Sequence, residues 1–86
     1  MGTVHARVRM YSRRRCGLCD EAREVIAAAG RAVPLRFDEI LIDGDDALEL
    51  RYGLRIPVIE VDGVEAFELT VDAGRLEELL RRGAGH

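Results

Sequence analysis

Apolar and polar positions alternate near the start of the chain and then change to a helical spacing. Apolar side chains occupy the even positions of residues 4–11, and His, Arg or Tyr occupies the odd ones. This period of two predicts a β-strand. Residues 19–29 carry one apolar stripe, which predicts a helix that ends at Gly30. The stripe consists of Ala22, Val25, Ile26 and Ala29.

Arg7 and Arg9 are unusual for a strand that is covered on both faces. Either one face of the sheet is open at that point, or the arginine stems lie along apolar surface with their guanidinium groups in water. The spacing does not decide between these two arrangements.

A second strand, a short helix and a hairpin follow along the chain. Residues 35–42 read as a strand that is closed by the turn at 43–45. Asp45 or Asp46 then caps a short helix, and Gly53 ends it. Residues 56–61 and 64–68 flank an Asp-Gly pair, which predicts a β-hairpin. We expect Tyr52 and Phe37 in the core.

The last helix begins after a capping residue, either Thr70 or Asp72, and its predicted end is Gly83. Its buried stripe is Val71, Leu76, Leu79 and Leu80. Glu77 and Glu78 are spaced to pair with the arginines four positions later, and such pairs need no function. We expect residues 83–86 to form a mobile tail. The predicted order is βαβαββα, an α/β fold.

Length and composition indicate one domain over residues 1–86. Apolar residues make up 48% of the chain, and no linker or repeat interrupts them. No apolar run approaches the ~18 residues of a membrane span, and the first residues do not resemble a secretory leader. A net charge of −3 gives no reason to expect nucleic acid or an anionic membrane as a partner. We therefore expect a soluble, cytoplasmic monomer.

Cys16 and Cys19 are the only two cysteines, and they lie between the first strand and the first helix. Two thiols in a helix's first turn suit disulfide exchange, which needs an attacking thiolate and a second thiol that resolves the mixed disulfide. The helix N-terminus should lower the pKa of the Cys16 thiol from about 8.5 toward the roughly 3.5–7.5 of reactive cysteines. Arg13, Arg14 and Arg15 should lower that pKa further, against the smaller opposing effect of Asp20. Cys16 is the predicted nucleophile and Cys19 the resolving thiol.

Two motifs carry a family resemblance. Residues 11–22 read Tyr-Ser-Arg-Arg-Arg-Cys-Gly-Leu-Cys-Asp-Glu-Ala, and residues 51–58 read Arg-Tyr-Gly-Leu-Arg-Ile-Pro-Val. Over residues 6–82 the chain resembles short bacterial glutaredoxin-like proteins of the thioredoxin-like superfamily with a Cys-x-Leu-Cys site. The resemblance implies a thioredoxin-like, glutaredoxin-type fold, with a four-stranded mixed sheet flanked by three helices. The Trp-Cys-Gly-Pro-Cys site of thioredoxin is excluded, because the chain has no tryptophan.

The resemblance also implies a substrate surface beside the cysteines. Pro57 is expected to follow a cis peptide bond there, which for X-Pro costs only about 0.5–1 kcal/mol. The backbone of Ile56 is expected to pair with an extended substrate that carries a thiol. Tyr11 lies at the border of the site in such proteins. The full set of expected substrate-binding residues is Arg13, Tyr11, Arg15, Leu18, Ile56, Pro57 and Asp72.

Glutathione remains open as a substrate. Glutathione-using glutaredoxins carry a basic residue three positions before the first cysteine, and Arg13 occupies that position. They also carry a Gly-Gly and an acidic pair near the last helix. Residues 67–72 read Phe-Glu-Leu-Thr-Val-Asp here, so the glycines are missing. Glu68 should repel the anionic peptide, while Asp72 can still contact its ammonium group.

The resulting functional prediction is a thiol–disulfide oxidoreductase. Its expected partners are a disulfide-containing protein or glutathione, with recycling by glutathione or a flavin-dependent reductase and no bound cofactor. The alternative is a binding module, either a redox switch or a carrier of an iron–sulfur cluster shared between two protomers. A zinc site needs about four ligands, and only His5 and His86 are available beyond the cysteines.

Overall fold

The computed structural model describes residues 5–84, and it confirms the predicted order of elements. The elements are β1 (Ala6–Ser12), α1 (Gly17–Ala32), β2 (Leu35–Leu41), α2 (Asp46–Tyr52), β3 (Val58–Val61), β4 (Val64–Glu68) and α3 (Ala73–Ala84). The strands form one sheet in the order β2-β1-β3-β4. β1 and β2 are parallel and the other pairs are antiparallel, so the sheet is mixed as expected.

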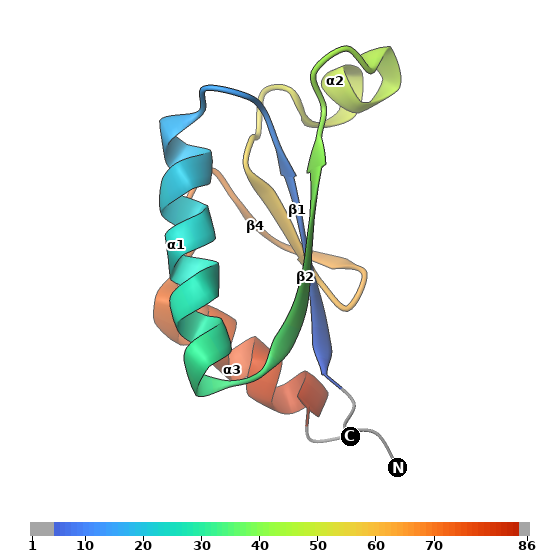
Figure 1. Cartoon of the computed structure of the whole chain (residues 1–86). Coiled ribbons are helices and arrows are strands. Elements are labelled where there is room, and N and C mark those ends of the chain that lie inside the picture. The colour runs from blue at the N-terminus through green and yellow to red at the C-terminus, as the bar shows by residue number, and fades with distance from the viewer. Residues whose placement is uncertain (1–4, 85–86) are drawn as a thin grey trace.

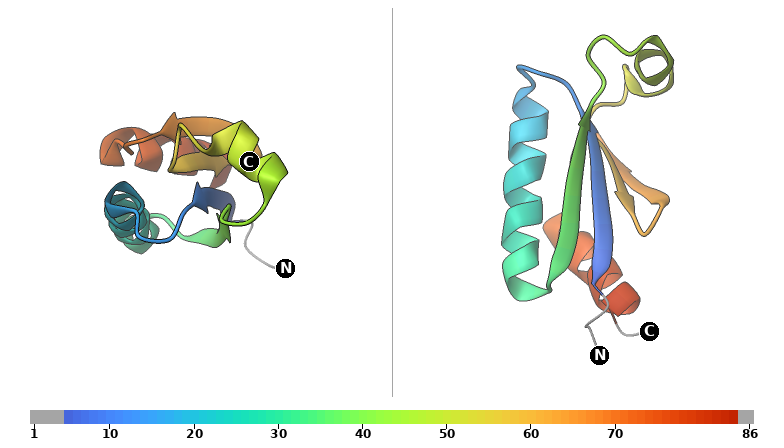
Figure 2. Two further views of the ribbon diagram at one scale, coloured as in Figure 1. Left: turned by 90° about the horizontal axis from the view of Figure 1, so that it is seen from above. Right: turned by 45° about the vertical axis from the view of Figure 1, so that its right-hand side comes forward.

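Helices cover the two faces of the sheet unequally (Figures 1 and 2). α1 and α3 lie together on one face, and the short α2 lies at one end of the other. The main core lies under α1 and α3, where Val8 and Met10 of β1 pair with Val61 and Ile59 of β3. The helices contribute Ala22, Ile26, Ala29, Leu76 and Leu80 to this core. The loop that carries Cys16, residues 13–16, leaves this sheet at the C-terminal end of β1.

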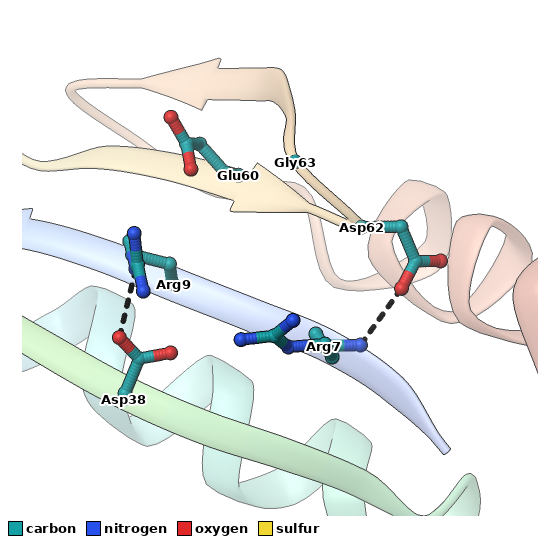
Figure 3. Close-up of a pocket in the computed structure, with 6 residues that line it drawn as sticks. All are labelled: Arg7, Arg9, Asp38, Glu60, Asp62 and Gly63. Atoms are coloured by element: carbon teal, nitrogen blue, oxygen red, sulfur yellow. Dashed lines mark hydrogen bonds and ion pairs between the residues drawn. The ribbon is translucent and has the colours of Figure 1, made fainter. Parts of the chain in front are cut away.

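The face opposite α1 and α3 is open beyond α2, which decides between the two arrangements expected for the arginines of β1. Figure 3 shows Arg7 and Arg9 on this face, in a cavity of about 290 Å³. Arg9 pairs with Asp38 of β2 at 2.8 Å, and the backbone N–H of Arg7 donates to Asp62 at 2.9 Å. The cavity is lined by residues of β1, β2, β3 and the turn after β3, and neither Cys16 nor Cys19 is among them.

The prediction that Gly30 ends the first helix is wrong, because α1 continues to Ala32. Gly30 does not adopt the positive φ of a helix-ending glycine. The C-cap is Val33, with φ −133° and ψ 112°. Pro34 follows it, and a proline disfavours the helical conformation in the residue before it. Pro34 therefore explains the end of α1.

The prediction that Phe37 is in the core is also wrong, whereas Tyr52 is buried as expected. Phe37 lies on β2, which is an edge strand, and its side chain is 39% exposed. Edge position therefore accounts for an exposure that the local apolar pattern did not indicate.

The ends of several other elements differ from the predicted ends by one or two residues, since α1 begins at Gly17, β1 and β2 end at Ser12 and Leu41, and β3 begins only at Val58. Asp45 caps α2 by accepting the Leu48 N–H at 3.1 Å, and Gly53 follows the helix. α3 continues past Gly83 to Ala84, so the predicted stop at Gly83 is wrong. Residues 85–86 of the predicted tail, and Val4 of the predicted first strand, lie outside the described residues.

α3 carries the ion pairs that its spacing predicted, Glu77 with Arg81 and Glu78 with Arg82. Val71 and Leu79 are partly buried beside Leu76 and Leu80. Within residues 5–84, no helix is long and apolar enough to cross a membrane.

Candidate active site

A disulfide joins Cys16 and Cys19 at the start of α1, with 5.2 Å between their Cα atoms. Cys16 is the N-cap, with an extended backbone, and its Sγ accepts the backbone N–H of Cys19 at 3.1 Å. Cys16 is half-buried, while Cys19 is only 1% exposed. The N-cap geometry therefore directs a helix N–H group at the more accessible sulfur, where it favours a thiolate.

The three arginines before Cys16 have different surroundings. The guanidinium of Arg13 pairs with Glu49 of α2 at 2.7 Å and donates to the Gly53 carbonyl at 3.3 Å. Arg14 is exposed, and its backbone N–H donates to Asp43. Arg15 is exposed, with φ +55°, a left-handed conformation that is uncommon outside glycine. The charge of Arg13 is thus already balanced by a carboxylate.

A polar network that the sequence analysis missed lies behind the loop. The buried Ser12 hydroxyl donates to Glu39, and Arg23 contacts both oxygens of Glu39 at 2.9 and 2.6 Å. Arg23 also pairs with Asp20 at 2.8 Å. The hydrogen bonds from Arg23 lower the pKa of Glu39 and raise that of Arg23. The i,i+3 spacing of Asp20 and Arg23 was readable, but Glu39 needed the register between β1 and β2.

Tyr11 lies on the face covered by α2. Its ring stacks on Tyr52 with 4.0 Å between centroids and 16° between planes. The guanidinium groups of Arg51 and Arg55 lie 5.2 and 5.5 Å from the Tyr52 ring centroid. Burial raises the pKa of the Tyr52 hydroxyl. Tyr11 therefore joins the end of β1 to α2, which is consistent with a place at the border of the site.

The expected cis peptide bond is present between Ile56 and Pro57. Both side chains are buried, and Cys16 packs against the core cluster that contains Ile56. The Pro57 carbonyl accepts the N–H of Leu69 at 2.9 Å, where Leu69 has φ +70°. Leu18 and Leu69 are 40% and 44% exposed. Apolar side chains therefore face solvent both within the Cys-x-x-Cys segment and on the loop that is bonded to Pro57.

The two acidic residues considered for glutathione have partners within the protein. Asp72 caps α3, because its Oδ1 accepts the N–H groups of Gly74 and Arg75 at 2.9 and 3.2 Å. Glu68 pairs with Arg55 at 3.2 Å, and the same guanidinium binds Glu65. If Asp72 contacts the ammonium group of glutathione and Glu68 repels the peptide, as predicted, both carboxylates do so while they make these contacts within the protein.

No group of three or more His, Cys, Asp or Glu side chains within residues 5–84 is placed to hold a metal ion. His86, one of the two histidines considered for zinc, lies outside that range.

Comparison with known proteins gives the family. The family model described as glutaredoxin-like domain (DUF836) matches residues 7–81. The chain belongs to this glutaredoxin-like family. The chain is similar to a structural-genomics target protein from X. campestris, with 40% identity over 87% of this chain and 96% of that one, and a TM-score of 0.73. No curated protein matches the sequence.

Thioredoxins share the fold of this glutaredoxin-like chain at low sequence identity. A thioredoxin variant from Halobacterium salinarum is 22% identical over 93% of this chain and 75% of that one, with a TM-score of 0.64. Mitochondrial thioredoxin 3 from Saccharomyces cerevisiae is 16% identical over 91% and 78% of the two chains, with a TM-score of 0.65. Together with the Cys16–Cys19 disulfide, the glutaredoxin-like family and this fold support a redox function in general.

Proposed function

We propose that this protein is a thiol–disulfide oxidoreductase in which Cys16 attacks and Cys19 resolves. The observation that carries the proposal is the environment of the pair. Cys16 is the accessible sulfur and accepts a helix N–H, whereas Cys19 is buried one turn further along α1. This arrangement favours a thiolate at the position that an external disulfide can reach.

The reaction is a two-electron exchange. The Cys16 thiolate attacks one sulfur of the substrate disulfide, and the other substrate sulfur leaves as a thiolate. The Cys19 thiolate then attacks Cys16 Sγ, which releases the second substrate thiolate and forms the Cys16–Cys19 disulfide. The substrate is reduced to two thiols, and the protein dithiol is oxidised. A disulfide-containing protein or glutathione is the proposed partner, and glutathione or a flavin-dependent reductase restores the dithiol.

A coupled turnover assay tests the proposal. The protein is assayed with hydroxyethyl disulfide in two parallel systems, one with glutathione and glutathione reductase and one with thioredoxin reductase. We expect turnover in at least one system, and none from Cys16→Ser. Absence of turnover in both, with a brown protein on anaerobic purification, would instead support the iron–sulfur carrier. Absence of turnover from a colourless protein would leave the redox switch.

A further inference from the structure

A groove begins at Leu18, between the two cysteines in the sequence, and runs between α1 and α3. A cavity of about 140 Å³ is lined by Leu18, Val25 and Glu21 of α1 together with residues 69–71. A second cavity of about 400 Å³ is lined by residues of α1 and α3. The two cavities share Glu21 and Val25. They therefore form one continuous surface, the α1–α3 groove, that starts at Leu18 inside the Cys-x-x-Cys segment.

The floor of the α1–α3 groove is apolar. Val25, Ala28 and Ala29 of α1 face Ala73 of α3 across it. At the end near the cysteines, Leu69 remains exposed in a left-handed conformation, held by its N–H bond to the Pro57 carbonyl. Exposed apolar surface that is contiguous and rimmed by polar residues is typical of sites that bind another molecule. The 140 Å³ cavity is smaller than a typical small-molecule site of roughly 300–1,000 Å³, so it suits one side chain.

The rim of the α1–α3 groove is acidic. Glu21 and Glu24 line it from α1, and neither makes an ion pair with any of residues 5–84. Glu77 lines it from α3 and pairs with Arg81 at 2.9 Å. The negative potential of these carboxylates attracts cations and repels an anionic peptide such as glutathione.

We propose that the α1–α3 groove binds the polypeptide that carries the substrate disulfide, through a segment of apolar residues interspersed with Arg or Lys. Apolar side chains cover Leu18, Leu69 and Val25, and the cationic groups lie against Glu21 and Glu24. This inference rests on the proposed function and names its substrate class, a protein disulfide flanked by a basic, apolar segment. The groove places that segment beside Leu18 of the Cys-x-x-Cys segment, while the disulfide exchange itself proceeds as described above.

Single-turnover reduction measures whether the protein prefers a disulfide that is flanked by a basic, apolar segment. Three synthetic peptides carry one cysteine as a mixed disulfide with mercaptoethanol, flanked by leucines with arginine, glutamine or glutamate between them. The pre-reduced protein is mixed with each, quenched with acid and analysed by mass spectrometry. We expect the arginine peptide to react about tenfold faster than the glutamate peptide at low salt, and the difference to shrink as salt is added.

Matched variants show which residues cause the preference for the arginine peptide. Glu24→Gln should reduce the arginine preference several-fold, whereas Asp46→Asn removes one charge from α2 and should leave it unchanged. Ala28→Tyr should slow all three leucine-containing peptides, whereas Ala27→Tyr, on the same helix but outside the groove lining, should not. Hydroxyethyl disulfide should react equally with all four variants.

The small disulfide separates the two proposals. Reduction of hydroxyethyl disulfide with equal rates for the three peptides would overturn the groove proposal and leave the proposed function standing. Equal effects of Ala28→Tyr and Ala27→Tyr would overturn it as well. If no disulfide is reduced, the proposed function fails. The groove is then tested by titrating the oxidised protein with the arginine peptide carrying serine for cysteine, where shifts confined to residues outside the groove would contradict binding there.

Discussion

The two sulfur atoms at the N-terminus of α1 have unequal surroundings. Cys16 accepts a backbone N–H and is reached from solvent, whereas Cys19 is enclosed by the core cluster. A helix N-terminus stabilises a thiolate, and burial disfavours the charged form. Capping and burial therefore distinguish the two thiols in the direction that the proposed roles require, and one of the three arginines, Arg13, is paired with Glu49.

Alkylation rates test this asymmetry. Near pH 7, Cys16 in the Cys19→Ser variant should react with iodoacetamide at least several-fold faster than Cys19 in the Cys16→Ser variant, because it is the more exposed thiol and accepts a helix N–H that favours the thiolate. Rates are measured from pH 4 to 10 by mass spectrometry. Faster reaction of Cys19 would reverse the assignment of nucleophile and resolving thiol.

Asp72 combines a structural role with a predicted binding role. Its carboxylate caps α3, so Asp72→Ala should lower the free energy of unfolding by about 1 kcal/mol. Asp72→Asn keeps a capping oxygen and should cost much less. Urea denaturation measures both values. Asp72→Asn removes only the charge. A loss of glutathione binding in this variant is therefore enough to identify a contact with the ammonium group.

At the scale of elements, one network joins β1, β2 and α1. Glu39 of β2 receives the Ser12 hydroxyl from the end of β1 and both contacts from Arg23 of α1. The loop of residues 13–16, which carries Cys16, lies between these two attachments, since Ser12 ends β1 and Gly17 begins α1. The network therefore fixes both ends of the segment that carries Cys16.

Glu39→Gln should lower stability by about 1–2 kcal/mol at neutral pH, because it removes charge-assisted hydrogen bonds. The pKa of Glu39 is lower in the folded protein than the unfolded value of about 4.3, so its stabilisation is complete above that pH. The difference between wild type and variant should shrink as pH falls through the folded pKa. Urea unfolding at several pH values measures this.

Asp38→Asn is the matched control for Glu39→Gln. Asp38 lies on the same strand in an exposed pair with Arg9, so its loss should cost under about 1 kcal/mol. A difference between wild type and Glu39→Gln that does not change with pH would contradict the ionic account of the network.

Local signals predicted the elements well where one residue decides the backbone. Asp45 and the Asp62-Gly63 turn lie where their chemistry required, and the order βαβαββα followed from them. The end of α1 was predicted wrongly because two residues near it, Gly30 and Pro34, can each end a helix. Gly30 remained helical because nothing forced a left-handed turn, and Pro34 ended α1 instead.

Contacts between elements could not be predicted from the sequence. The Cys-x-x-Cys pair at the start of a helix could be predicted from its spacing, and the cis bond at Pro57 from the resemblance to a known family. The partners of Arg13 and Glu39 depend on where α2 and β2 lie, and no local spacing encodes that. The same reason explains the exposure of Phe37 at the sheet edge.

At the scale of the whole molecule, charge is distributed unevenly around the cysteines. Arg14 and Arg15 are exposed in the loop before Cys16, while the α1–α3 groove, which begins at Leu18 after Cys16, carries Glu21 and Glu24. Arg13 is held by α2 through Glu49. A polypeptide that contacts both Cys16 and the groove would therefore meet cations before Cys16 and carboxylates after it, as the groove proposal requires.

Glutathione should accordingly bind weakly and reduce the Cys16–Cys19 disulfide slowly. Its carboxylate would have to displace Glu49 from Arg13, and an exposed ion pair contributes only about 0–1 kcal/mol. Glu49→Gln should free the Arg13 charge and tighten glutathione binding a few-fold, whereas Asp46→Asn on the same helix should not. Chemical-shift titration of the Cys19→Ser protein measures the affinity. Saturable shifts at millimolar or lower glutathione around Arg13, Ile56 and Asp72 in the otherwise unchanged protein would show that glutathione is a good ligand despite the missing glycines.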